Sequence, residues 1–364
     1  MIRRFYYRFR GYPLLSRYTR HSAGPKNHLP TGYLLLECIQ GETGQMLSNV
    51  WSKQWEEPKR RRRLYQGLAR TMLSLARVPQ PRIGSFRIND DGTITLTGRP
   101  LTCAMMILEN DGTPRTINEG DTFASTDTFV SDMLSFYSSR FLSHPNACYD
   151  ASDCREQMAI QVILRAISHR YIEPGHRAGP FLVQLTDLHR SNILVDDDWN
   201  IACIIDLEWV CALPAEALSV PYWLTGKRTD QLRDEDLAEY DKVRCEFMRV
   251  FEEEERRATP ARHPTILSRV LSSTWDSGGV WFWHCLTSTN AMFCLVKQHL
   301  CSPFAISFDT TDVEEVLSKL WCIDAEAVVE KKVADYGEYK AQLQRLYTEE
   351  DESSHKQIAS DKTS

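Results

Sequence analysis

The sequence of 364 residues has no acidic residue before Glu37, no cysteine pair at Cys-x-x-Cys spacing and no apolar run long enough to cross a membrane. Its 11 cysteines are scattered, without a Cys/His cluster at zinc spacing, which excludes a zinc module and indicates reduced thiols. The best membrane candidate, residues 280–296, is uncharged but only 17 residues long and interrupted by polar residues. This pattern favours a buried helix.

The composition is that of an ordinary globular chain, with 42% hydrophobic, 25% charged and 10% aromatic residues. The length predicts two structural units or one two-lobed enzyme. A net charge of −6 provides no general attraction to nucleic acid or to an anionic membrane, so we expect neither as a partner. Reduced thiols favour a cytoplasmic location.

Residues 1–30 form a basic segment with six arginines and Lys26. Two interpretations stay open. The charge is typical of a mitochondrial presequence, whereas the bulky Phe5, Tyr6 and Tyr7 and the scarcity of serine favour a poorly ordered N-terminus. We prefer the second and keep a mitochondrial location as the alternative.

Apolar periodicity predicts the elements in the first half. A buried strand spans residues 33–39, and a basic run at 59–63 opens a helix with Leu64, Leu68, Met72 and Leu75 on one side. That run is interpreted as a solvated first turn rather than a nuclear signal or a phosphate-binding patch. Residues 85–96 alternate around an Asn-Asp-Asp-Gly turn, which predicts a hairpin.

The second half is expected to be mainly helical. Predicted helices span residues 127–140, 153–169 (with Asp153 and Glu156 as its cap), 234–257, 279–300 and 312–347. Predicted strands span residues 181–183, 193–195 and 201–205, with an acidic turn at 196–198. The composition of residues 351–364 predicts a disordered tail.

The stretch 181–209, FLVQLTDLHRSNILVDDDWNIACIIDLEW, carries the candidate chemistry. Asp187 is followed five residues later by Asn192, and Asp206 comes directly after a buried strand. A metal-dependent phosphoryl transferase needs one carboxylate beside the attacking hydroxyl, and an amide and a second carboxylate to hold magnesium against nucleotide phosphates. Loops at the ends of rigid strands provide that geometry.

This stretch resembles the aminoglycoside phosphotransferase and choline kinase-like superfamily, whose pattern is approximately H-G-D-x-x-x-x-N followed by I-D-x-E. It is similar to a group of fungal proteins in which the segment reads L-T-D-L-H, as here. The segments GYLLLECIQG, PRIGSFRINDDGTITLTGRPL and DLEWVCALPAEALSVPYWLT extend the resemblance to roughly residues 30–300. It implies an α+β, protein kinase-like fold with a mainly helical large lobe.

The resemblance also implies roles for individual residues. Asp187 would be the catalytic base or hydroxyl-orienting group, and Asn192 and Asp206 would be ligands of Mg²⁺. Glu37 and Cys38, in a hinge near residues 33–41, would bind ATP. The acceptor would be a small molecule with a hydroxyl group.

Two further residues have open roles. Leu185 stands where the superfamily has the histidine that braces the catalytic loop, and His189 is a partial substitute or a loop residue without a chemical role. Glu208 is a metal contact or, as we prefer, a surface or supporting carboxylate. A metal-dependent hydrolase using Asp187, His189 and Asp206 is a weaker alternative, because paired histidines for two metals are missing.

A small lobe with a phosphate-covering loop and a lysine is expected before the hinge, where this sequence has little room. Two interpretations stay open: an N-terminally truncated or misread form of a complete kinase-like enzyme, and a shortened form with a reduced N-terminal lobe. In both, a 31–300 phosphotransferase-like domain is followed by a helical extension at 301–350. The alternative function is a non-catalytic kinase-fold protein that binds a ligand or partner.

The acceptor itself cannot be read from the pattern. Aromatic residues Trp209, Tyr222 and Trp223, with carboxylates Glu208 and Glu216, would suit a cationic amine if they lined one cleft. The interpretation that we favour places these residues in the core and at its rim.

Overall fold

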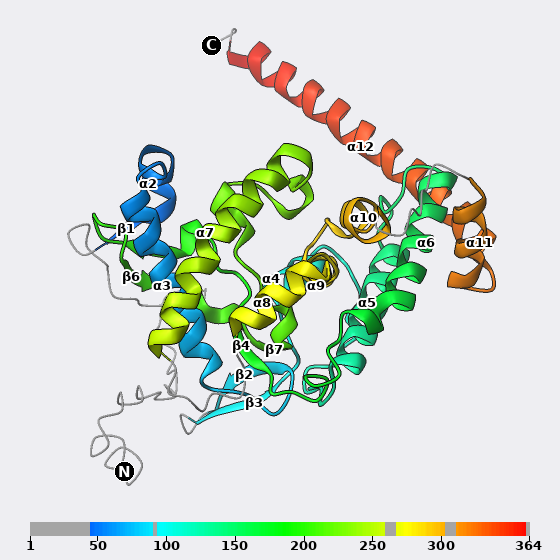
Figure 1. The fold of residues 1–364 in the computed structure, drawn as a ribbon. Coiled ribbons are helices and arrows are strands. Elements are labelled where there is room, and N and C mark those ends of the chain that lie inside the picture. The colour runs from blue at the N-terminus through cyan, green and yellow to red at the C-terminus, as the bar shows by residue number, and fades with distance from the viewer. Residues whose placement is uncertain (1–43, 90–92, 259–266, 303–310, 362–364) are drawn as a thin grey trace, which may run out of the picture.

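The computed structural model describes residues 44–89, 93–258, 267–302 and 311–361, which form a mainly helical α+β fold (Figure 1). Its helices are α2 (Leu47–Gln54), α3 (Pro58–Ala76), α4 (Cys103–Asn110), α5 (Thr126–Ser143), α6 (Ala151–Ile167), α7 (Asp234–Ala258), α8 (Leu267–Asp276), α9 (Gly279–Thr287), α10 (Met292–Leu295), α11 (Thr311–Trp321) and α12 (Ala325–Asp361). Its strands are β1 (Gln45–Met46), β2 (Gly84–Ile88), β3 (Ile94–Gly98), β4 (Leu182–Leu185), β5 (Ile193–Val195), β6 (Ile201–Ile204) and β7 (Val210–Leu213). The basic segment 1–30 and the hinge with Glu37 and Cys38 lie outside the described residues.

The described strands form two antiparallel sheets, with strand orders β1-β5-β6 and β3-β2-β7-β4. The β4–β7 pair continues into a bond from Thr186 N–H to the Trp209 carbonyl (3.2 Å). The β5–β6 pair ends with a bond from Ile205 N–H to the Asn192 carbonyl (3.0 Å). These two pairings bring the loop after β4 against the loop after β6, although about twenty residues separate them in the chain.

The predicted hairpin at 85–96 is confirmed, because β2 pairs with β3 and Ile88 lies opposite Ile94. The other edge of β2 pairs with β7, which attaches the hairpin to the sheet. A Cβ at position 84 would lie 2.7 Å from the Gly98 carbonyl oxygen and 2.9 Å from a methyl of Thr122. Gly84 therefore permits an approach that no residue with a side chain would allow.

Helix α3 buries the apolar side predicted from its sequence, including Leu64, Leu68 and Met72. It packs against α7, where the rings of Tyr65 and Phe247 meet edge to face with centroids 5.4 Å apart. Such aromatic pairs add to the hydrophobic stabilisation that burial supplies. The α3–α7 pair forms one side of the fold (Figure 1).

The basic run at the start of α3 pairs with acids on α7. Pro58 begins the helix, and the run occupies its first turns at the surface, as predicted. Arg61 contacts both carboxylate oxygens of Glu246, with its Nε 3.1 Å from Oε2, and Arg62 contacts Glu253. The charge pattern predicted the helix turn, whereas the α7 partners became apparent only in the structure.

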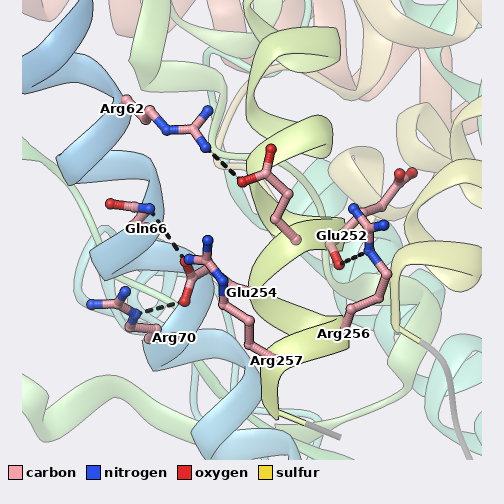
Figure 2. Close-up of polar contacts among 8 residues, drawn as sticks. Arg62, Gln66, Arg70, Glu252, Glu254, Arg256 and Arg257 are labelled. Atoms are coloured by element: carbon pink, nitrogen blue, oxygen red, sulfur yellow. Dashed lines mark hydrogen bonds and ion pairs between the residues drawn. The ribbon is translucent and has the colours of Figure 1, made fainter.

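Glu254 is the central acid of this helix pair (Figure 2). Its side chain is only 5% exposed, yet it accepts from Arg70 Nε (2.7 Å), Gln66 Nε2 (3.3 Å) and Arg257 (2.6 Å). Burial alone would raise the pKa of Glu254, but the bonds and charge of Arg70 and Arg257 hold this pKa below its usual value.

The α3–α7 pair packs around one hydrophobic core cluster, and helices α5, α6 and α9 enclose a second. The predicted helices at 127–140 and 153–169 are confirmed, but the predicted cap is wrong. Asp150 is the N-cap of α6, since its carboxylate accepts from Asp153 N–H (2.9 Å). Asp153 instead accepts from the backbone N–H of Tyr149 (3.1 Å), so two nearby acids share the capping of this turn.

The predicted single helix at 279–300 is wrong, because the chain leaves α9 at Ser288, which is extended (φ −104°, ψ 152°). The Ser288 hydroxyl accepts from Ala291 N–H (2.8 Å) and starts α10. Serine, threonine and asparagine at 288–290 compete for backbone groups and so favour a cap over a helix interior.

The C-terminal region comprises α11 and α12, which pack on α6 before α12 projects away from the rest (Figure 1). The buried Lys332 anchors α12 by donating to the Leu142 and His144 carbonyls. The helix continues to Asp361, through residues for which the composition predicted a tail. Several of those residues are good helix formers. No helix among the described residues is both long and apolar enough to span a membrane.

Candidate functional site

Asp187 lies in the loop that follows β4, where Asn192 holds it. The Asn192 side-chain amide donates to the backbone carbonyl (2.9 Å) and the carboxylate (3.2 Å) of Asp187. Asn192 is buried, whereas a quarter of the Asp187 side chain remains exposed. The carboxylate is therefore oriented by a rigid partner and still accessible to a ligand.

His189 contacts Asp187 from the same loop. Its Nδ1 accepts from Ser191 N–H (3.2 Å), which leaves the proton of the neutral ring on Nε2. That Nε2 lies 3.6 Å from Asp187 Oδ1, an electrostatic contact longer than a hydrogen bond. The structure thus places His189 beside the carboxylate that the missing histidine at position 185 would have braced.

Asp206 follows β6 and adopts a left-handed backbone conformation, with φ 56° and ψ 56°. Aspartate tolerates this region better than most residues, and an unusual backbone at the end of a buried strand is typical of functional sites. Asp206 and Asp187 line the same small pocket, formed by residues 185–188, 204–207, 209 and 210. The strand pairings described above bring these two acids to one place.

The donors at this place suit a magnesium ion. The amide nitrogen of Asn192 is used by Asp187, and its amide oxygen accepts no hydrogen bond from another described residue. The exposed Asp206 carboxylate makes no hydrogen bond or ion pair with another described residue. Oxygen donors of this kind fit Mg²⁺, which retains water and shares phosphate oxygens rather than requiring an all-protein cage.

A self-sufficient metal centre is not found in the described part of the chain. No three His, Cys, Asp or Glu side chains there are grouped to hold a metal ion. The alternative of a hydrolase built on Asp187, His189 and Asp206 therefore gains no support among these residues.

Cys103, at the start of α4, belongs to the site although its sequence carries no sign of this. Its thiol lies near the Asp187 carboxylate, and its pKa is raised to about 11 by burial, by Asp187 and by Glu208. Cys103 therefore stays a neutral thiol at pH 7, and Glu208 is exposed but close enough to influence it. Cys103 lies near the Asp187 loop, more than 80 residues away in the chain, only because the strands and helices pack together.

A cavity of about 420 Å³ opens beside this loop, within the range of roughly 300 to 1,000 Å³ typical of small-molecule sites. Asp187 and His189 line it, together with Tyr222 and Trp223. Burial and the charge of Asp187 raise the pKa of Tyr222, so its phenol stays protonated.

The residues that the sequence suggested for an acceptor cleft do not all line one cavity. Trp209 lines the small pocket rather than the cavity. Glu216 is buried, accepts from Glu173 N–H (3.2 Å) and lies near His176, and it does not line the cavity. Trp223 both lines the cavity and belongs to the core. The interpretation as core and rim therefore holds for part of the set.

The mainly helical α+β fold with two small antiparallel sheets is that of a kinase-like domain with a reduced sheet lobe, as predicted. A family model described as "Phosphotransferase enzyme family" matches residues 19–217, more than half of the chain. The chain belongs to this family. No curated protein and no solved structure gives a significant match. The matched region includes Asp187, Asn192 and Asp206.

Proposed function

We propose that the protein transfers the terminal phosphoryl group of ATP to a hydroxyl group of a small molecule bound in the 420 Å³ cavity. The observation that carries the proposal is the position of Asp187. It lines both the large cavity and the small pocket that contains Asp206, and Asn192 holds it there. One carboxylate thus faces both an acceptor site and a candidate metal site.

In this reaction the acceptor oxygen forms a bond to the γ-phosphorus, and the bond between that phosphorus and the β–γ bridging oxygen breaks. Asp187 orients the hydroxyl and accepts its proton, and ADP leaves. Asn192 and Asp206 would hold Mg²⁺, which neutralises charge on the phosphates when it is bound. His189 contacts Oδ1 of Asp187, the carboxylate oxygen that Asn192 does not bind.

The experiment is transfer of labelled phosphate from γ-labelled ATP to a small-molecule extract, with Mg²⁺ or with EDTA. The proposal requires a labelled small molecule that forms only with Mg²⁺ and is lost in Asp187→Asn. Asp197→Asn, in the exposed hairpin turn, is the matched control. Extract compounds that raise the melting temperature, without any labelled product, would instead establish a non-catalytic binding protein.

A further inference from the structure

Among the described residues, the carboxylates that line the cavity are those of Asp187 and Asp230; Glu208 lies near Cys103 but does not line it. The carboxylate of Asp230 is held by the Arg228 guanidinium through two bonds, of 3.1 and 2.7 Å. Burial and the neighbouring His299 lower the pKa of His284 to about 4, so His284 is uncharged at pH 7. Cys103 and Tyr222 are neutral as well.

The remaining walls are mostly apolar and come from several elements. Helix α3, helix α4, strand β4 and the segment after β7 each contribute at least one large aliphatic side chain. These include Met72, Leu75, Ile107, Leu185, Leu213 and Leu218. The rings of Tyr222 and Trp223 complete this surface. An ammonium group against it would lose its hydration without a carboxylate to replace the lost water.

Neutral hydrogen-bonding residues line several parts of the wall, among them Thr71, Gln184 and Thr229, and they are most concentrated where α9 ends. Thr287, Ser288, Thr289 and Asn290 line the cavity there. Asn290 accepts from Arg140 (2.8 Å) through its amide oxygen, which leaves the amide NH₂ as a donor. Such groups suit oxygen atoms on an uncharged ligand.

We infer that the acceptor is an uncharged, largely apolar alcohol and not a polycationic aminoglycoside or another cationic amine. That the ligand is a phosphoryl acceptor rests on the proposed function, whereas its chemical class follows from the cavity alone. Recognition comes from the aliphatic and aromatic walls and from neutral donors at 287–290. Asp187 is reserved for the reacting hydroxyl.

The test uses two probes with the same skeleton, farnesol and farnesylamine, and the polycation kanamycin. Their dissociation constants are measured by titration calorimetry on the full chain without ATP, so that turnover does not enter. We expect farnesol to bind at least about tenfold more tightly than farnesylamine, and kanamycin not to bind. Equal or tighter binding of either cation, or no binding of farnesol, would overturn the inference.

A charge introduced at the rim supplies the matched comparison. Ile107 lines the cavity and is 46% exposed, so Ile107→Asp should fold; Ile88→Asp, at a 73% exposed position outside the cavity, is the control. Ile107→Asp should weaken farnesol binding at least about fivefold and strengthen farnesylamine binding, whereas Ile88→Asp should change neither. The same loss in both variants would refute recognition by the cavity wall.

The binding experiments can fail or succeed independently of the proposed phosphotransfer. Asp187→Asn should still bind farnesol within about threefold of the unchanged chain, because the apolar walls are intact. Farnesol binding without any phosphate transfer would refute the enzyme and leave the ligand class standing. Phosphate transfer to a cationic acceptor would refute the ligand class and leave the enzyme standing.

Discussion

The Asn192 amide donates at once to the backbone carbonyl oxygen of Asp187, at 2.9 Å, and to its carboxylate, at 3.2 Å. This double contact closes the loop between β4 and β5 and leaves the Asn192 oxygen for another partner. The group that orients the proposed base is thus the same group that would bind the metal. A change at either residue is expected to affect both functions.

Asp187→Asn is expected to lower the phosphotransfer rate by at least about a hundredfold while the fold stays intact. The substitution deletes proton acceptance without changing the side-chain volume. Single-turnover rates and circular dichroism measure the two effects. An unchanged rate of ATP consumption would contradict the role assigned to Asp187.

Asn192→Asp is expected to shift the acidic limb of the pH–rate profile upward by at least about one pH unit. It places a second carboxylate about where the amide now lies, 3.2 Å from the first, and neighbouring carboxylates hold a proton to higher pH. Since the proposed base must be deprotonated, activity below that pH is lost. Asn192→Ala removes the same bonds without adding charge, so it should lower the rate and leave the limb in place. Identical profiles for the two variants would exclude the electrostatic explanation.

Glu254→Gln is expected to lower the free energy of unfolding by about 1.5 to 3 kcal/mol, because a buried, charge-assisted set of bonds loses its charge. Glu253→Gln breaks a more exposed pair with Arg62 and should cost less than about 1 kcal/mol. Urea denaturation measures both values. Since the pKa of Glu254 is lowered, its contribution is present above the unfolded value of 4.5 and fades as the pH falls below it. Equal costs for the two neighbours would show that burial does not distinguish them.

Acid should destabilise the protein partly through His284. Burial, with a contribution from His299, lowers the pKa of His284 to about 4 from its ordinary 6.5. The unfolded chain therefore binds the proton first, and stability that is present above pH 6.5 is lost as the pH falls to 4, by up to about 3 kcal/mol. His284→Phe keeps an aromatic ring beside Tyr222 and cannot titrate. Thermal unfolding of this variant should depend less on pH in that window, and an unchanged dependence would contradict the prediction.

Much of the local structure was predictable because local rules determine it. Alternating apolar residues predicted the hairpin at 85–96, and the apolar stripe of α3 predicted its buried side. The turn after β5 was also predicted, where Asp196 accepts from Asn200 N–H (2.9 Å). The helix at 279–300 was wrong because three capping residues outweighed the apolar residues around them.

The sequence by itself determined which residues stand at the ends of the strands: Asp187 and Asn192 after β4, and Asp206 after β6. Those positions follow from the period of the strands and the turn residues between them, which are properties of neighbours in the chain. Only the tertiary structure decided that Cys103 lies near Asp187 and that Glu216 is buried away from the cavity. The physical reason is that the charge and polarity of a cavity depend on contacts between segments far apart in the chain, and no local pattern records those contacts.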